Sequence, residues 1–409
     1  MNSPLLLSLL LLSAPAFAQV KAIAPKSGPP PVGPYSPGVF AGDYLYVSGQ
    51  GAKAPDGTIP ATFEGQAKQM LENVKAVVEA AGLTLDNVVY TQLYLDDMRN
   101  LDEMNRVYRT YFKGTLPARA TLGAAKLPGT PVELNAVAVR DASQKKVVNV
   151  KGYDPGEPVS PGVLTDDRLF ISGMRGRRLG DGSVPADAGE QVSLALEGFR
   201  AVVEAAGLRM ANVVFVNPYL TSAIPTRTMN ELYAKQFEFG NTPARATIQV
   251  ASLPENAQIE FTGVAVRDLA KRKAVRPKNM APSPTASPCV FAGDTFYCSA
   301  KSGFIPGVNG GIFASTVEHQ LRQTMRNLLD NLEEAGMDFR NVVAANVYLN
   351  DIAEFAAMNK LYAKYFADIP PSRTTIQQVA PVAAEMSADG AYPTLEQVSI
   401  IAFVGSAKK

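Results

Sequence analysis

The 409-residue chain has few of the side chains that metal sites and nucleophilic catalysis use, with one histidine, His319, and two cysteines, Cys289 and Cys298. A zinc site or a Cys/His catalytic pair needs more such residues, so the sequence supports neither. No glycine-rich phosphate-binding loop occurs, and no cofactor is implied. A formal net charge of +1 gives no field that would attract nucleic acid or an anionic membrane, so we expect neither as a partner.

Apolar stretches long enough to span a membrane are also lacking. The first eighteen residues, MNSPLLLSLLLLSAPAFA, are apolar from Leu5 to Leu12, whereas a permanent membrane helix needs about 20 apolar residues. They end with Ala16-Phe17-Ala18, the small-x-small pattern of an export signal. We therefore predict that residues 1–18 are a signal peptide cleaved after Ala18, and that the mature protein is periplasmic or secreted.

One arginine-containing motif occurs three times, as LPARAT at 116–121, TPARAT at 242–247 and PPSRTT at 370–375. The arginines are 126 and 128 positions apart, which is too long for a solenoid repeat and about the length of a domain. The sequence therefore predicts three tandem domains, at residues 19–148, 149–277 and 278–409.

Two basic runs lie near the predicted domain boundaries, Lys145-Lys146 and KRKAVRPK at 271–278. Each is accompanied by prolines or polar residues. We interpret both as solvated linkers between domains.

Each copy shows the same order of helix and strand patterns. Apolar residues at steps of three and four predict a helix that ends at a glycine, and a valine-rich strand follows. A second helix comes next, for which Asn100 and Glu103 suggest an N-terminal capping box. With a hairpin before the first helix and two strands after the second, the order is β-β-α-β-α-β-β, an α+β unit with its helices on one face of a sheet. The first helices are expected at 63–83, 188–208 and 317–337, and the strands after them at 88–95, 213–220 and 342–349.

Both cysteines lie in the third hairpin, SPCVFAGDTFYCSA. If Gly293-Asp294 form a two-residue turn, Cys289 and Cys298 face each other in a non-hydrogen-bonded pair, where side chains approach most closely. Export to an oxidising compartment would favour a disulfide, whereas the strand ladder is also compatible with two buried thiols. The sequence leaves both possibilities open.

The first copy contains, in order, the motifs GPYSPGVFAGDYLYVSGQ (33–50), the helix with Gln66 and Asn73, MNRVY (104–108), PARAT (117–121) and LPGTPVELNAVAV (127–139). Together they resemble the Rid family of small enamine/imine deaminases, also called YjgF or L-PSP endoribonuclease-like, and the resemblance extends more weakly through the other two copies. It implies a chorismate-mutase-like fold that ordinarily assembles as a homotrimer, so that three fused copies would form a pseudo-trimer within one chain.

The resemblance also implies site residues in clefts between neighbouring domains. In the family, an arginine holds a substrate carboxylate, and a strand glutamate helps to place or activate the water that hydrolyses a 2-imino acid to a 2-keto acid and ammonia. The corresponding residues here are Arg119, Arg245, Arg373, Tyr35 and Asn105 for substrate binding, and Glu133 and Glu260 for catalysis.

These residue types suit the chemistry. A guanidinium is a rigid, permanently charged group that can bind a carboxylate in bidentate fashion. A carboxylate that accepts a proton from water supplies general-base assistance, typically worth about 10²–10⁴-fold. Spacing alone favours a cross-strand ion pair between Arg119 and Glu133, whereas the resemblance favours the catalytic interpretation for the first two copies.

The copies differ at these positions, so three equivalent sites are not expected. Tyr35 corresponds to Val159 and Ala286, and Gln397 stands where the third copy should have its glutamate. Glu396 is adjacent to Gln397 but should point to the opposite face of the strand.

A complete site requires Tyr35 to meet a neighbour that has both arginine and glutamate, and the second copy offers both whereas the third does not. The sequence does not give the direction in which the copies pack around the ring, so which cleft is intact stays open. Arg373, in the copy without the glutamate, is expected to matter less than Arg119 or Arg245.

Two functions therefore compete for this sequence. One is an exported deaminase of small imines or enamines, and the other is a non-catalytic binder of small carboxylate or aromatic metabolites. Endoribonuclease activity rests on the family's historical name, and a neutral charge with one histidine gives it little support. We expect a monomer, because fused copies can satisfy each other's interfaces.

Overall fold

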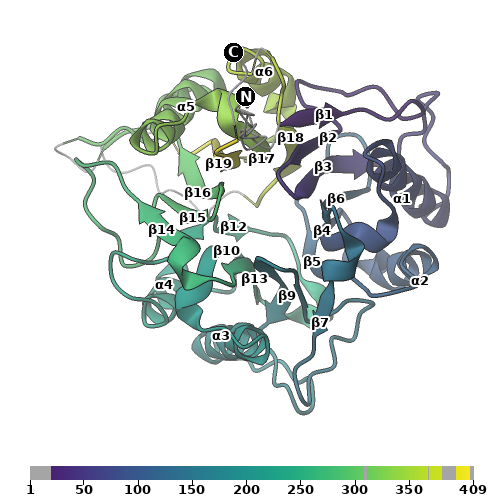
Figure 1. Cartoon of the computed structure of the whole chain (residues 1–409), viewed down its shortest axis with the longest axis horizontal. Helices are drawn as coiled ribbons and strands as arrows, with labels where there is room; N and C mark the ends of the chain where they lie inside the picture. The colour runs from purple at the N-terminus through teal and green to yellow at the C-terminus, as the bar shows by residue number, and fades with distance from the viewer. Residues whose placement is uncertain (1–19, 308–310, 367, 380–392, 406–409) are drawn as a thin grey trace, which may run out of the picture.

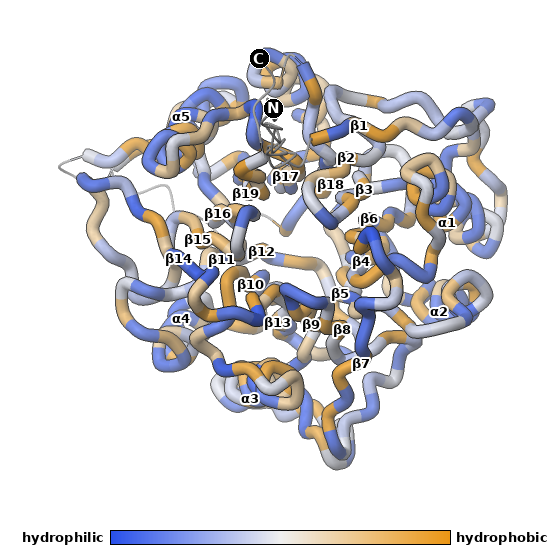
Figure 2. The backbone as a smooth tube through the Cα atoms, viewed as in Figure 1, coloured by the Kyte–Doolittle hydropathy of each residue, from blue (hydrophilic) through white to orange (hydrophobic). Residues whose placement is uncertain are grey.

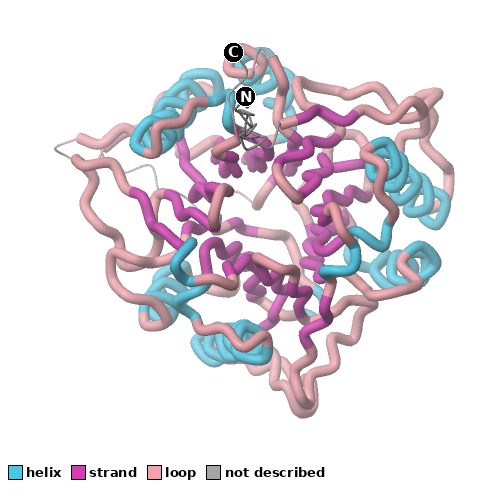
Figure 3. The backbone as a smooth tube through the Cα atoms, viewed as in Figure 1, coloured by secondary structure: helices cyan, strands magenta, loops and turns pink. Residues whose placement is uncertain are grey.

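The three predicted domains form a ring of three similar units. The computed structural model describes residues 20–307, 311–366, 368–379 and 393–405, so the predicted signal peptide lies outside the described residues. The units follow one another around the ring, with their strands towards the centre and their helices on the periphery (Figures 1 and 3). The expected pseudo-trimer of α+β units is confirmed.

The first unit sets the pattern for the other two. Its sheet has the order β1-β2-β3-β6-β4-β5, in which only β4 and β5 pair in parallel. Its helices cover the outer face of the sheet and bury one hydrophobic core there. The elements are β1 (Lys21–Ile23), β2 (Gly38–Ala41), β3 (Tyr44–Gly51), α1 (Phe63–Ala80), β4 (Val88–Leu95), α2 (Leu101–Tyr111), β5 (Ala118–Gly123) and β6 (Val132–Val139).

The second and third units repeat this order around their own cores, and apolar residues of the central strands are orange in Figure 2. The second unit consists of β7 (Lys146–Val148), β8 (Gly162–Leu164), β9 (Arg168–Arg175), α3 (Ala188–Ala205), β10 (Val213–Leu220), α4 (Thr226–Ala234), β11 (Ala244–Arg245), β12 (Ile248–Gln249) and β13 (Ile259–Val266). The third consists of β14 (Arg272–Val275), β15 (Cys289–Ala292), β16 (Thr295–Ser302), α5 (Val317–Glu334), β17 (Val342–Leu349), α6 (Phe355–Tyr362), β18 (Ser372–Gln377) and β19 (Glu396–Phe403).

A proline explains why the second unit has two short strands, β11 and β12, where the others have one. Pro218 in β10 has no N–H to donate to the neighbouring strand. The side-chain amide of Asn217 donates instead to the Ala246 carbonyl at 3.1 Å. The strand beside β10 is therefore divided into β11 and β12, and both parts still pair with β10.

The interpretation of the basic runs as linkers is wrong. Strand β7 contains Lys146 and pairs with β8, and β14 contains Arg272 and Lys273 and pairs with β15. Both runs begin the sheet of the following unit, so the second and third units start a few residues before positions 149 and 278. Exposed basic side chains are typical of such edge strands, because they discourage pairing with another chain.

Two details at helix ends can be compared with the sequence. Gly82, Gly207 and Gly336 have φ of +79°, +73° and +71°, which confirms the predicted glycine ends of the three long helices. The predicted capping box at Asn100 is wrong, because Asn100 has helical backbone angles and no capping hydrogen bond. The turn begins earlier, at Asp97, whose carboxylate accepts the Arg99 N–H.

The hairpin β15–β16 contains a disulfide. Cys289 and Cys298 are opposite each other with Cα atoms 4.0 Å apart, and their sulfurs are bonded. This arrangement decides between the two possibilities that the sequence left open.

The units contact one another through different residues at one equivalent position. Tyr44, Arg168 and Thr295 begin β3, β9 and β16, and all three meet. The buried Arg168 guanidinium lies 4.4 Å from the centre of the Tyr44 ring and donates to Thr295 Oγ1 at 2.7 Å. Three different side chains therefore pack together at this position. Three identical copies would place the same side chain there three times and could not form this contact.

We predict that the protein is a monomer in solution, because each unit covers the interface faces of the other two. Light scattering should give the mass of one chain. Deleting the third unit from about Pro277 onward would expose apolar faces of the first two, and the fragment should aggregate or form new oligomers. A stable trimer of full chains, or a monomeric fragment with an unchanged melting temperature, would contradict this prediction.

In the described part of the chain, no helix is long and apolar enough to cross a membrane.

Candidate functional site

The three recurring arginines lie at the three interfaces, each held by the following unit. The backbone N–H groups of Arg119, Arg245 and Arg373 each donate to a serine Oγ at 2.8 Å. Strand register shifts next to each serine, and such a bulge re-aims side chains. The serines are Ser172, Ser299 and Ser48, in the second, third and first units.

Each cleft therefore combines the arginine of one unit with residues of the next unit. We name the clefts after their arginines: the Arg119 cleft between the first and second units, the Arg245 cleft between the second and third, and the Arg373 cleft between the third and first.

The Arg373 cleft unites three of the candidate residues. Arg373, Tyr35 and Glu133 line one cavity of about 90 Å³, together with Gln50 and Thr375. A side chain at Gly49 would overlap the Glu133 carboxylate, so glycine is required there for the carboxylate to reach the cavity.

Arg373 has no carboxylate partner among the described residues. It is 4% exposed, its Nη1 contacts Met358 Sδ at 3.9 Å, and the rings of Tyr35 and Tyr362 lie 5.4 and 4.9 Å from its guanidinium carbon. Burial lowers its pKa. Since a buried charge without a partner is costly, this arrangement favours an anionic ligand.

Glu133 is also buried, and burial favours the uncharged form of its carboxyl. Burial raises the pKa of its carboxyl to about 8, although Arg373 acts in the opposite direction. A carboxyl with a pKa near the working pH can both accept and return a proton.

The Arg119 cleft has the equivalent arginine, but a glutamate side chain of the protein, Glu157, fills it. Arg119 Nη2 lies 2.5 Å from Glu157 Oε2, and Arg175 Nη1 lies 2.5 Å from Glu157 Oε1. The first unit has Gly33 at the position of Glu157, where a side chain would run into the guanidinium of Arg373. Glu157 thus occupies the space that Gly33 leaves open.

The charged side chains of the Arg119 cleft form ion pairs with one another. Burial by itself would raise the pKa of Glu157, but Arg175 and Arg119 lower it to about 2. Glu255 pairs with Arg175 at 3.4 Å and with Arg177 at 3.0 Å. Its φ of +58° is unusual for a non-glycine residue, and these ion pairs help to hold it there.

Glu260 reaches the Arg119 cleft much as Glu133 reaches the Arg373 cleft. Its carboxylate lies over Gly173, and Arg175 is opposite it in the strand register. Burial raises its pKa to about 8, against the effect of Arg175.

The Arg245 cleft has no carboxylate among the lining residues that the structure describes. Gln397 replaces the glutamate, and its amide donates to the Thr247 carbonyl at 3.1 Å and to Gln378 Oε1 at 2.9 Å. Ala300 replaces the glycine that a glutamate would require. Lys301 of the third unit lines this cleft with Arg245.

Several sequence-based expectations need correction. Arg119 and Glu133 form no ion pair, because they lie in different clefts. The sequence left open which neighbour Tyr35 meets. The requirement that this neighbour supply both arginine and glutamate is wrong, since Tyr35 and Glu133 of the same unit face Arg373 of the third. Arg373, expected to matter less, belongs to the cleft that contains Tyr35 and Glu133.

Asn105 does not line the open cleft. Its Oδ1 accepts from Arg119 Nη2 at 2.6 Å, so it orients the arginine of the filled cleft. Glu396 points away from the clefts, as expected, and accepts from Thr324 of α5.

Sequence reasoning did not identify Glu157, Arg175 or Lys301. A signal for Glu157 was present, because GPYS at 33–36 aligns with EPVS at 157–160. Only the ring order reveals that Glu157 faces the arginine of the preceding unit.

We predict that the protein becomes less stable as pH rises from about 5 to 8. Glu133, Glu260 and Glu396 each have a pKa raised to about 8 by burial, so the folded state holds protons that the unfolded chain releases near its ordinary value. The contribution of these carboxyls to the stability of the folded state is therefore fully present below the ordinary pKa of glutamate, and it is lost as pH rises through about 8. Urea unfolding at pH 5, 6.5 and 8 measures the slope.

Glu396→Gln provides the control for this pH dependence, because it removes one titrating group outside the clefts. It should reduce the slope. Stability that rises over this pH range would contradict the prediction.

Comparison with known proteins gives the same three divisions. The family model described as Endoribonuclease L-PSP matches residues 25–140, 152–267 and 278–388. A mouse 2-iminobutanoate/2-iminopropanoate deaminase is 40% identical over 123 residues, covering 29% of this chain and 91% of the mouse protein. The protein of that name from Escherichia coli K12 is 39% identical over 125 residues, covering 29% of this chain and 98% of its own.

Solved structures match over one unit. The crystal structure of the YjgF gene product from E. coli is 39% identical, with a TM-score of 0.29, and the match covers 30% of this chain and 99% of that one. E. coli TdcF with bound serine is 36% identical with a TM-score of 0.29, over 30% of this chain and 99% of that one.

Proposed function

Because this chain belongs to the endoribonuclease L-PSP family, in three tandem copies, we propose that it hydrolyses small 2-imino acids to 2-keto acids and ammonia in the Arg373 cleft. One observation supports this location: the buried Arg373, which has no carboxylate partner in the described part of the chain, shares a cavity with Glu133. The relatives named 2-iminobutanoate/2-iminopropanoate deaminase suggest the substrate class. The predicted signal peptide would place the activity outside the cytoplasm.

In this proposal, Arg373 binds the carboxylate of the substrate and thereby fixes the adjacent C=N carbon. Glu133 in its ionised form accepts a proton from water as the water oxygen adds to that carbon of the protonated imine. The resulting tetrahedral carbon bears a hydroxyl and an amino group. Glu133 returns the proton to the nitrogen, and the C–N bond breaks as Glu133 takes the hydroxyl proton, so that ammonia and the 2-keto acid leave.

The size of the cavity supports a small substrate. Its volume of about 90 Å³ is bounded by the Tyr35 ring and by Pro128 and Thr130 of the first unit. We propose 2-iminopropanoate and 2-iminobutanoate as the acids to test first.

The test is ammonia release from a freshly generated 2-imino acid. The result expected is release above the spontaneous rate, inhibited by the corresponding 2-keto acid. Binding of the 2-keto acid without any acceleration would overturn the proposal.

A second candidate function is the binding of small carboxylates without turnover. It is favoured by the Arg119 cleft, which Glu157 fills, and by the Arg245 cleft, which has Gln397 instead of the glutamate. The ammonia measurement separates the two candidates.

A further inference from the structure

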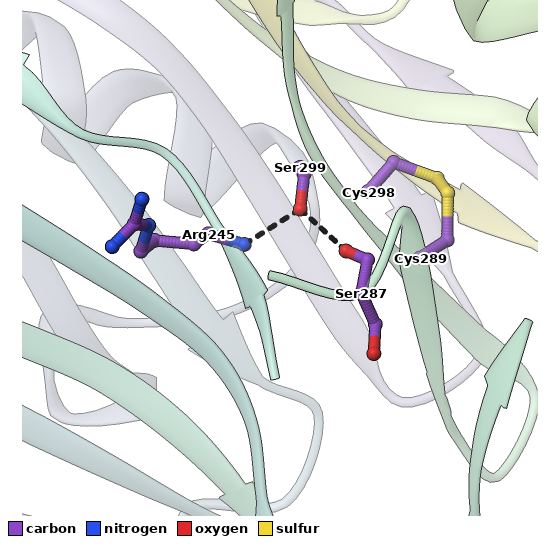
Figure 4. The surroundings of a disulfide bond; sticks show 5 residues. All are labelled: Arg245, Ser287, Cys289, Cys298 and Ser299. Carbon is purple, nitrogen blue, oxygen red and sulfur yellow. Dashed lines mark hydrogen bonds between the residues drawn. A yellow bond between two sulfur atoms is a disulfide. The ribbon is translucent and has the colours of Figure 1, made fainter. Parts of the chain in front are cut away.

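The Arg245 cleft presents its arginine in the same way as the other two clefts. The Arg245 N–H donates to Ser299 Oγ at 2.8 Å, and Ser299 Oγ donates to the Ser287 carbonyl at 2.6 Å (Figure 4). The Cys289–Cys298 disulfide joins the two strands directly beside these serines. Arg245 Nη1 donates to Asn230 Oδ1 at 2.7 Å, so the guanidinium is also held from its own unit.

The chemistry of this cleft differs from that of the other two, because it contains two cations. Lys301 occupies the position of Gln50 in the first unit and Met174 in the second, and it lines the same cavity as Arg245. Among the residues that the structure describes, neither cation forms an ion pair and no lining residue is acidic. Burial lowers the pKa of both side chains.

The lining of the Arg245 cleft also differs from that of the Arg373 cleft, because Ala286 replaces the Tyr35 ring. The Arg245 cavity has a volume of about 330 Å³. Beyond Lys301 a further cavity of about 610 Å³ continues past Phe304 and Asn327, and its one acidic lining residue, Asp330, pairs with Arg326 at 2.6 Å.

We propose that the Arg245 cleft binds a small dicarboxylate, with one carboxylate on Arg245 and the other on Lys301, and that it does not hydrolyse it. Two partly buried cations that have no carboxylate partner among the described residues favour a ligand with two negative charges over one with a single charge. Gln397 cannot accept a proton from water, so the cleft has no equivalent of Glu133. This site is independent of the proposed hydrolysis.

The experiment is calorimetric titration of the full chain with 2-oxoglutarate and, separately, with the monocarboxylate 2-oxobutanoate. Lys301→Gln writes the residue of the first unit into the third and should weaken 2-oxoglutarate binding by about 10-fold or more, the effect of one lost charged hydrogen bond. Lys301→Met, the residue of the second unit, should behave in the same way. 2-Oxobutanoate binding should be unchanged in both.

Arg373→Gln is the matched control, because it alters the other open cleft. It should leave the affinity of the Lys301-dependent 2-oxoglutarate site unchanged. The proposal is overturned if the wild-type chain does not bind 2-oxoglutarate at millimolar concentration, if Arg373→Gln abolishes binding while both Lys301 variants retain it, or if inorganic phosphate binds more tightly than the dicarboxylate. Unchanged melting temperatures of the variants confirm that they fold.

Discussion

Glu133→Gln is expected to slow imine hydrolysis by about 10²–10⁴-fold, the usual contribution of general-base catalysis. The substitution keeps the shape of the side chain and introduces the residue that the third copy has at this position, Gln397. Because Arg373 is untouched, binding of a 2-keto acid should change little. A lower kcat with little change in ligand affinity is the pattern of an interaction that acts mainly in the transition state.

Glu260→Gln is the matched control for Glu133→Gln. It makes the same change at the equivalent strand position, in the cleft that Glu157 fills, and should leave the hydrolysis rate within about twofold. Equal losses in both variants would show that the Arg119 cleft also reacts. Full activity in the Glu133 variant would remove this carboxylate from the mechanism.

The fold was predictable because each local signal agrees with the packing. Apolar periodicity, glycine helix ends and valine-rich strands occur in the same order in all three copies, so the unit could be derived once and repeated. Strands β7 and β14 were missed because their charged residues suggest solvent. Exposed charge at an edge strand and exposed charge in a linker have the same pattern in a sequence.

The candidate residues were predictable, but their grouping was not. In the sheet order, β4 lies between β5, which has Arg119, and β6, which has Glu133, so the two residues cannot be cross-strand neighbours. Strand β5 is at the sheet edge, and its arginine therefore faces the next unit. Which unit follows is a property of the closed ring, and the spacing along the chain does not contain it.

The three clefts show how fused copies can diverge while the fold is kept. A homotrimer must carry any substitution in all three clefts, whereas here each cleft can change separately. Ala300 with Gln397 illustrates a linked change, because the glycine becomes unnecessary once no glutamate has to lie over it. Gly49 with Glu133 and Gly173 with Glu260 retain the original combination.

Glu157→Gly is expected to lower the free energy of unfolding by about 3–5 kcal/mol, the typical result of removing one partner from a buried ion pair. The carboxylate lies between Arg119 and Arg175, and its loss leaves two buried guanidinium groups without it. Glycine also introduces the residue of the first unit and opens the space beside Arg119. Urea unfolding measures the loss, and added 2-oxobutanoate should restore part of it by binding Arg119.

Glu157→Gln separates the charge of this residue from the space that it fills. It should also destabilise the protein, but 2-oxobutanoate should restore less stability, because the side chain still occupies the cleft. The reverse change, Gly33→Glu, should place a carboxylate beside Arg373 and abolish imine hydrolysis without loss of stability, since the flexible guanidinium can shift to form an ion pair. Full activity in Gly33→Glu would show that a carboxylate at this position does not block Arg373. If Glu157→Gly costs less than about 1 kcal/mol, then Glu157 does not hold the Arg119 cleft closed by charge pairing.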